Sequence, residues 1–152
     1  MIEITDVRAL RDRISEEIAV GDWFEVSQAR IDQFAAATGD TQWIHVDPAR
    51  AAAESPFKTT IAHGFLTLSL LSSLIRDAMT FHGLRMAINY GMNRMRFVAP
   101  VPAGSRIRAR FMLVSVEDAS GSVQVTWQVT IDREHSEKPC CVAEWIVRYY
   151  LA

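Results

Sequence analysis

One stretch of the chain places a carboxylate and an imidazole at a spacing that could support acid–base chemistry. It reads FAAATGDTQWIHVDPARAAA, with Asp40 directly after a glycine and His45 five residues later. On a continuous helix, five residues turn the chain by about 500° and leave the two side chains roughly 140° apart, so they converge only if TQWI is a turn or loop. One water could then lie between them, with one group taking its proton and the other returning one. The alternative is that Asp40 ends the preceding helix and His45 is a partly buried structural histidine.

A second stretch, IAHGFLTLS from Ile61 to Ser69, precedes and begins a strongly apolar segment. The first backbone N–H groups of a helix have no partner inside the helix, and a glycine there lets a ligand carbonyl approach closely. Gly64 could therefore supply an oxyanion hole for a developing enolate. The alternative is that Gly64 only starts the helix, and that Ser69, Ser72 and Ser73 bond back to it.

Other chemistries have weaker support in the sequence. Potential metal ligands are present, but no HExxH or paired-cysteine pattern accompanies them, so we expect no metal site. These residues are Asp40, His45, Asp47 and His63. No GxSxG, GxGxxG or GxxxxGK[ST] pattern occurs, which argues against a serine hydrolase of that type and against nucleotide-phosphate binding.

Helices flanking the Asp40–His45 stretch would position it. A helix is predicted from about Gln28 to Thr38, capped by Ser27 and stopped by Gly39. A second short helix is predicted from Pro48 through Ala53, with Asp47 as its cap. Further upstream, residues 1–20 are predicted to form an amphipathic helical extension, because apolar residues recur there at steps of three and four: Val7, Leu10, Ile14 and Ile18.

The longest predicted helix, Gly64 to Met79, has apolar residues in almost every direction around its axis, which is typical of a buried central helix. Alternating apolar and polar residues then predict successive strands. These strands span Arg85–Tyr90, Met95–Val101, Ser105–Glu117, Val123–Ile131 and Cys141–Leu151, after a first short strand at Gly21–Val26. Short turns between strands require antiparallel pairing. The sequence therefore predicts an α+β fold in which an antiparallel sheet wraps around a buried central helix.

Composition fits one soluble domain spanning residues 1–152. Hydrophobic residues make up 49% of the chain, charged residues 22%, and the net charge is −2. We therefore expect no attraction to nucleic acid, and the apolar run around Leu70 is too short to cross a membrane. The adjacent Cys140 and Cys141 would point to opposite faces of a strand and stay unbridged, as expected of a cytoplasmic protein.

Taken together, the two stretches resemble a known family. The pattern TGD-x4-H-x2-P-x3-A followed by AHG-x4-S is similar to that of the MaoC-like, or type 2, (R)-specific enoyl-CoA hydratases, and the resemblance extends from about Val20 through NYGMNRMRFVAPVPAG to the end of the chain. It implies a hot-dog fold, Asp40 and His45 as the catalytic pair, a Gly64 amide that binds the thioester, and an active-site serine at Ser69. The family's usual Asn-Pro after the aspartate is Gln42-Trp43 here, which changes the pocket's shape. Further substrate contacts are expected at His63, Phe65 and Asn93.

The resemblance further implies reversible hydration of a trans-2-enoyl-CoA to an (R)-3-hydroxyacyl-CoA. Asp40 would take a proton from the attacking water, and His45 would orient that water and supply the proton to C2. No cofactor is expected beyond the acyl-CoA substrate itself, and the partner is expected to be a second copy in a homodimer. A hot-dog acyl-CoA thioesterase and a non-catalytic acyl-CoA-binding subunit are the alternatives.

Overall fold

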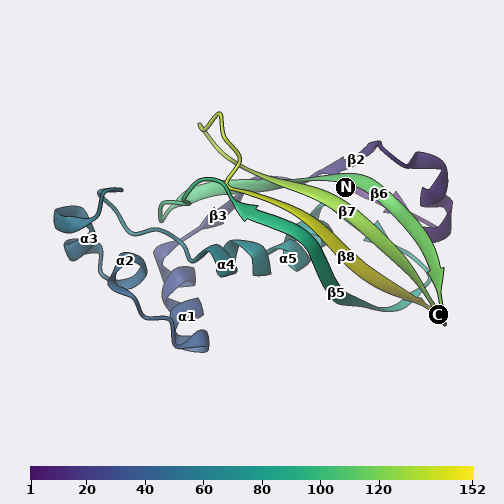
Figure 1. Cartoon of the computed structure of the whole chain (residues 1–152), viewed down its shortest axis with the longest axis horizontal. Helices are drawn as coiled ribbons and strands as arrows, with labels where there is room; N and C mark the ends of the chain where they lie inside the picture. The colour runs from purple at the N-terminus through teal and green to yellow at the C-terminus, as the bar shows by residue number, and fades with distance from the viewer.

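The computed structural model describes all 152 residues, and its main feature is a six-stranded antiparallel sheet that curves over a helical segment (Figure 1). The strand order is β2–β6–β7–β8–β5, and β3 pairs with β6 beside β2. The strands are β2 (Glu17–Val20), β3 (Phe24–Val26), β5 (Leu84–Phe97), β6 (Ser105–Ala119), β7 (Ser122–Arg133) and β8 (Cys141–Leu151). This arrangement confirms the α+β class and the antiparallel sheet around a helix.

The central helix runs as α4 (Gly64–Ser69) and α5 (Leu71–Ala78), with Leu70 still in a right-handed helical conformation between them. Its sheet-facing side is fully buried and includes Leu66, Leu71 and Leu74. The opposite side is exposed, with Phe65 68% accessible and Ser69 and Arg76 also exposed. The prediction of a helix buried on every side is thus wrong for a single chain, because one curved sheet covers only one side of a helix.

The core lies between this helix and the inner faces of β6, β7 and β8. Alternate residues of these strands are completely buried, among them Phe111 and Trp127, whose rings meet edge to face. Fully burying an aromatic or aliphatic side chain of this size contributes roughly 1.5–3 kcal/mol. The Trp127 indole N–H donates to the Tyr149 hydroxyl at 3.2 Å, so the one polar atom of this ring is satisfied inside the core.

The N-terminal extension differs from the predicted helix. It consists of β1 (Ile2–Ile4), a 3-10 helix η1 (Val7–Arg13) and β2. Ser15 has φ 72° and ends the helical segment, and Ile14 is 47% exposed. The buried residues of η1, Val7 and Leu10, are three apart, which fits the three-residue period of a 3-10 helix as well as it fits an α-helix.

Two further differences concern strands. The segment predicted at 85–90 and the first part of that predicted at 95–101 form one continuous strand, β5, which ends at Phe97 and whose register shifts at three places against β8. Such bulges let a strand absorb a sequence such as Asn-Tyr-Gly-Met-Asn without ending. The chain also forms a separate two-stranded parallel pair, β1 with β4 (Met79–Phe81), that sequence periodicity did not predict.

None of the helices combines the length and the apolar content needed to span a bilayer. Cys140 and Cys141 are both free, as predicted, and both are buried, with Cys140 just before β8 rather than on the strand. Burial raises the pKa of the Cys140 thiol to about 12 and that of Cys141 to about 11.

Candidate active site

The segment that carries the predicted pair is positioned by helix α1 (Gln28–Thr38), whose bounds match the prediction. The Ser27 hydroxyl accepts the Arg30 N–H at 3.2 Å at its start. Gly39 ends the helix with φ 79°, a left-handed conformation that glycine adopts without a Cβ clash. The chain therefore turns sharply immediately before Asp40.

His45 lies on a single helical turn, α2 (Trp43–Val46), rather than in the expected loop. The non-helical part of the connection is confined to residues 39–42, and it is sufficient to bring the two side chains together. A carboxylate oxygen of Asp40 and ring nitrogens of His45 and His63 all lie within 4.8 Å of one another. Two groups each about 2.8 Å from one water can be up to about 5.6 Å apart, so a single water can contact both Asp40 and His45.

The environment of His45 sets its protonation state. The side chain is 7% exposed, and Nδ1 lies 2.7 Å from the Ile61 carbonyl. Because a carbonyl only accepts, Nδ1 carries the proton, and the neutral ring has its lone pair on Nε2. Burial lowers the pKa of His45 below its usual 6.5, and the neighbouring His63 lowers it further, although the Ile61 bond and Asp40 oppose this. His45 is therefore neutral at pH 7, with a free acceptor nitrogen.

His63 connects the separate parts of the site. Its ring stacks on His45 with centroids 3.8 Å apart and planes 24° from parallel, and its other neighbour is Phe34 at 4.9 Å. Nε2 donates to the backbone carbonyl of Asp40 at 2.9 Å. His63 is 3% exposed, and its Nδ1 has no hydrogen-bond partner. The structure thus places this predicted substrate contact between the segment that carries Asp40 and His45 and the start of α4.

Gly64 follows His63 directly and begins α4. Its amide makes none of the turn, loop or cap hydrogen bonds, so this N–H is available to an external acceptor. A Cβ at this position would lie 2.7–2.9 Å from ring atoms of Phe97, closer than real Cβ contacts come. A side chain at position 64 would therefore require the Phe97 ring to move.

Two residues that sequence reasoning missed hold the segment in place. The Gln28 side-chain amide donates to the His45 backbone carbonyl at 2.8 Å, and its oxygen accepts the hydroxyl of Thr60. Thr60 is 1% exposed, so this link between α1, α2 and the strand-like segment before α4 is shielded from water. A glutamine at the first position of a helix carries no sequence signal for this role.

The remaining predicted residues lie at varying distances from the pair. Gln42 is exposed next to Asp40, and Trp43 packs beneath the Arg50 guanidinium, 4.4 Å from its ring centre. Ser69 is exposed and donates to the Phe65 carbonyl at 2.7 Å, the self-bonded alternative noted above. Phe65 meets the Phe97 ring edge on, with centroids 6.0 Å apart.

Asn93 is not brought to the site. Its amide donates to Glu144 at 2.8 Å. Glu144 alternates with the buried residues Ala143 and Trp145, so it lies on the sheet face away from the helix. A bulge between Met92 and Arg94 turns Asn93 to that outer face, a change of direction that strand periodicity alone does not predict.

The cluster also contains residue types that bind divalent metals, although no metal motif was found in the sequence. Backbone carbonyls already engage His45 Nδ1 and His63 Nε2. The atoms left for an external ligand are the Asp40 carboxylate, His45 Nε2 and His63 Nδ1.

The chain resembles a known domain family and several known proteins. Residues 10–135 match the MaoC-like domain. The chain is 56% identical over 135 residues to the 3-hydroxyacyl-thioester dehydratase Z of Mycobacterium tuberculosis, covering 88% of this chain and 89% of that protein. It is 48% identical over 141 residues to nodulation protein N of Rhizobium leguminosarum, covering 88% and 84%.

Among solved structures, the fold superimposes on the (R)-hydratase from A. caviae involved in PHA biosynthesis with a TM-score of 0.67 at 22% identity, covering 91% of this chain and 96% of that one. This likeness shows the hot-dog fold. The family match and the high identity to a named dehydratase show the reaction type. The chain therefore belongs to the MaoC-like dehydratase family and is a hydro-lyase, a hydratase or dehydratase of the MaoC type.

Proposed function

We propose that this protein is an (R)-specific enoyl-CoA hydratase, which reversibly adds water to a trans-2-enoyl-CoA to give an (R)-3-hydroxyacyl-CoA. The observation that carries the proposal is the approach of Asp40 and His45 to the spacing of one bridging water, beside the unpartnered amide of Gly64. The names of a close relative, a 3-hydroxyacyl-thioester dehydratase, and of an (R)-hydratase with the same fold support it.

The tautomer of His45 changes the roles expected from the sequence. Because Nδ1 donates to Ile61, neutral His45 has no proton on Nε2 to give at the start. In the proposed hydration, Asp40 accepts one hydrogen bond from the water, and Nε2 takes the other water proton while the oxygen attacks C3. The imidazolium then returns this proton to C2. The product gains the elements of one water, and both side chains end as they began.

Gly64 would bind the thioester carbonyl through its free N–H. Negative charge builds on that oxygen when the nucleophile adds at C3, and a donor aimed at such a charge is typically worth about 2.7–4 kcal/mol. The thioester itself makes the α-carbon acidic, so the proposed reaction uses no further cofactor. A groove of about 270 Å³ beside Gly64, lined by residues including Phe57, Ile61, Thr67 and Phe97, offers a path for the thioester arm.

The acyl chain would extend from Gly64 along the central helix. A groove lined by Leu68, Ser69, Ser72 and Asn89 lies between this helix and β5. It shares Ser72, Asn89 and Trp145 with a larger pocket farther along α5. We expect the acyl chain in these two hollows, which share lining residues.

The test is the loss of enoyl-thioester absorbance when crotonyl-CoA is mixed with wild-type protein and with the variants Asp40→Asn and His45→Asn. Asparagine at position 45 can still donate to the Ile61 carbonyl but offers no basic nitrogen. We expect each variant to fold and to hydrate about 10²–10⁴-fold more slowly. Chiral analysis should find the (R) product. Release of free thiol without loss of the double bond would indicate a thioesterase, and near wild-type rates in both variants would refute the assignment.

We further propose that the protein forms a homodimer through β5. This 14-residue strand is an open sheet edge and exposes apolar side chains including Met86, Ile88 and Tyr90. Long exposed apolar edges are prone to pair with another strand unless something covers them. Sedimentation should give twice the 17.1 kDa chain mass. Replacing Ile88 and Tyr90 with lysine should yield monomers, whereas a wild-type monomer at micromolar concentration would contradict the proposal.

A further inference from the structure

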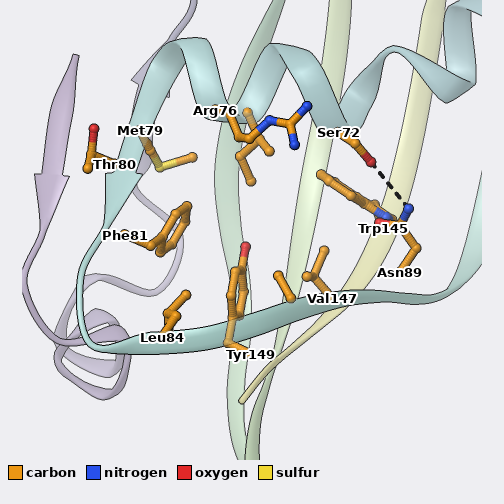
Figure 2. A pocket seen from close by; sticks show the side chains of 12 residues that line it. Ser72, Arg76, Met79, Thr80, Phe81, Leu84, Asn89, Trp145, Val147 and Tyr149 are labelled. Atoms are coloured by element: carbon orange, nitrogen blue, oxygen red, sulfur yellow. Dashed lines mark hydrogen bonds between the residues drawn. The ribbon is translucent and has the colours of Figure 1, made fainter. Parts of the chain in front are cut away.

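The larger pocket, of about 530 Å³, lies between α5 and the strands β5 and β8 (Figure 2). Ser72, Ile75 and Arg76 line it from the helix, and Trp145, Val147 and Tyr149 line it from β8. Helices α1, α2 and α3 (Pro48–Glu54) gather beyond one end of the sheet (Figure 1), and the pocket lies beside α5, which follows α4 along the central helix. From Gly64 to Met79 the helix rises by about 22 Å at 1.5 Å per residue.

The end wall of this pocket is β4 with the start of β5. Met79, Thr80 and Phe81 line the pocket from β4. The Phe81 ring faces the Tyr149 ring across the pocket end, with centroids 4.8 Å apart and planes 25° from parallel. Tyr149 is in turn held by the Trp127 N–H in the core. The β8 side of the wall therefore belongs to the main sheet, whereas the β4 side pairs with no strand of that sheet.

The position of β4 depends on the first residues of the chain. Its strand partner is β1, in parallel register with Ile2 opposite Met79 and Ile4 opposite Phe81. The His82 N–H donates to the Ile4 carbonyl at 2.9 Å, and Glu3 pairs with the His82 ring. Figure 2 shows β1 directly outside β4, on the side away from the pocket. β1 is the only strand that pairs with β4, and Ile4 is buried, so β1 contributes to the position of β4 beside the anchor that Met79 provides in the core.

Building on the proposed function, we propose that β1 sets the depth of the acyl pocket and so limits the length of the acyl chain that the enzyme accepts. A short acyl group bound at Gly64 ends before it reaches the wall. A long-chain acyl group runs the length of α5 and meets Phe81. Residues 1–4 are thus a specificity-determining segment that makes no contact with the reacting atoms.

The experiment compares wild type with three variants on trans-2-enoyl-CoAs of increasing acyl length. The substrates run from crotonyl-CoA through octenoyl-CoA and dodecenoyl-CoA to hexadecenoyl-CoA. Phe81→Ala removes the wall itself, and deletion of residues 1–4 removes its support. Val20→Ala, at an exposed position of β2, is the matched control for a change in an N-terminal strand. The measured quantity is kcat/KM for each enoyl-CoA divided by kcat/KM for crotonyl-CoA with the same variant.

We expect this ratio for the longest chains to rise about tenfold or more in both Phe81→Ala and the deletion, the scale on which one misfitted methylene changes discrimination. Val20→Ala should keep the wild-type profile. If deletion of residues 1–4 leaves the dependence of relative kcat/KM on acyl length as in wild type, the proposal is overturned, whatever the result for Phe81→Ala. If the deletion variant does not fold, Ile4→Ala takes its place, with the same two outcomes.

Binding of saturated acyl-CoAs, which cannot be hydrated, separates this proposal from the proposed function. Calorimetric affinities of these ligands should show the same wild-type length limit, and the deletion should extend it. A protein that hydrates no enoyl-CoA but shows this limit would refute the function and support the pocket. If the wild type hydrates crotonyl-CoA but the deletion leaves the acyl-length limit unchanged, the proposed function is supported and the role of β1 is refuted.

Discussion

Replacing His63 tests whether the Asp40–His45 segment and the start of α4, the two segments proposed to be catalytic, depend on the residue between them. His63→Gln places an amide N–H where Nε2–H donates to the Asp40 carbonyl, but removes the ring that stacks on His45. His63→Phe keeps a ring against His45 and Phe34 but removes the donor. The two variants therefore separate the hydrogen bond from the stack.

The magnitudes follow from these contacts. A hydrogen bond contributes about 0.5–1.5 kcal/mol net. Because Asp40 is exposed, water can replace the lost donor, and we expect His63→Phe to lower the free energy of unfolding by about 1 kcal/mol, or Tm by about 2–4 °C. Its effect on rate should be larger, since misplacing a catalytic group by about 1 Å can cost roughly 10²-fold. His63→Gln should retain more activity than His63→Phe, because it still ties Asp40 to α4.

The pH profile distinguishes this role from a purely structural one. Burial and then His63 lower the pKa of His45, and both variants remove the second cause. The pKa of His45 should therefore rise, so His45 Nε2 becomes protonated at a higher pH and can no longer accept the water proton. The acidic limb of kcat/KM for crotonyl-CoA should move upward in both variants. Rates and an acidic limb equal to wild type in His63→Phe would refute the reasoning.

Two further predictions concern packing. Gly64→Ala should lower the free energy of unfolding by about 1 kcal/mol, the low end for overpacking, because the clashing Phe97 ring is 43% exposed and can swing toward solvent. In thermal melts, the double variant Gly64→Ala/Phe97→Ala should recover stability relative to Gly64→Ala. A Gly64→Ala variant as stable as wild type would contradict the clash. Cys140 and Cys141 should resist a thiol reagent at pH 8 in the native protein, because burial raises their pKa to about 12 and about 11, respectively. Both should react after denaturation. Rapid labelling of either thiol in the native protein would disprove its burial.

The parts of the fold that the sequence predicted are those with local signals. Helix α1 has a capping serine and a terminating glycine, and β8 alternates strictly, so their bounds agree with the structure. The extension before β2 was mispredicted because Val7 and Leu10 fit two helical periods, and because Ile18 continues an apparent helical pattern into a strand. The β1–β4 pair joins residues far apart in sequence, which no local pattern reports.

The same division holds at the active site. Residue types and the Gly39 turn were enough to identify Asp40, His45 and Gly64 as candidates. The proton position on His45 was not predictable, since it depends on the Ile61 carbonyl, 16 residues away. The supporting residues Gln28 and Thr60 are likewise defined only by contacts across 17 and 32 residues.

The two borders of the main sheet have different consequences for self-association. On one border, β2 and β3 are four and three residues long and are separated by Gly21–Trp23, so they cannot form a continuous ladder with a strand from another copy. Only β5 presents a long template. Each chain can therefore add a strand at one edge only. Two copies paired through β5 about a two-fold axis would cover both β5 edges, so the assembly would not grow into a filament.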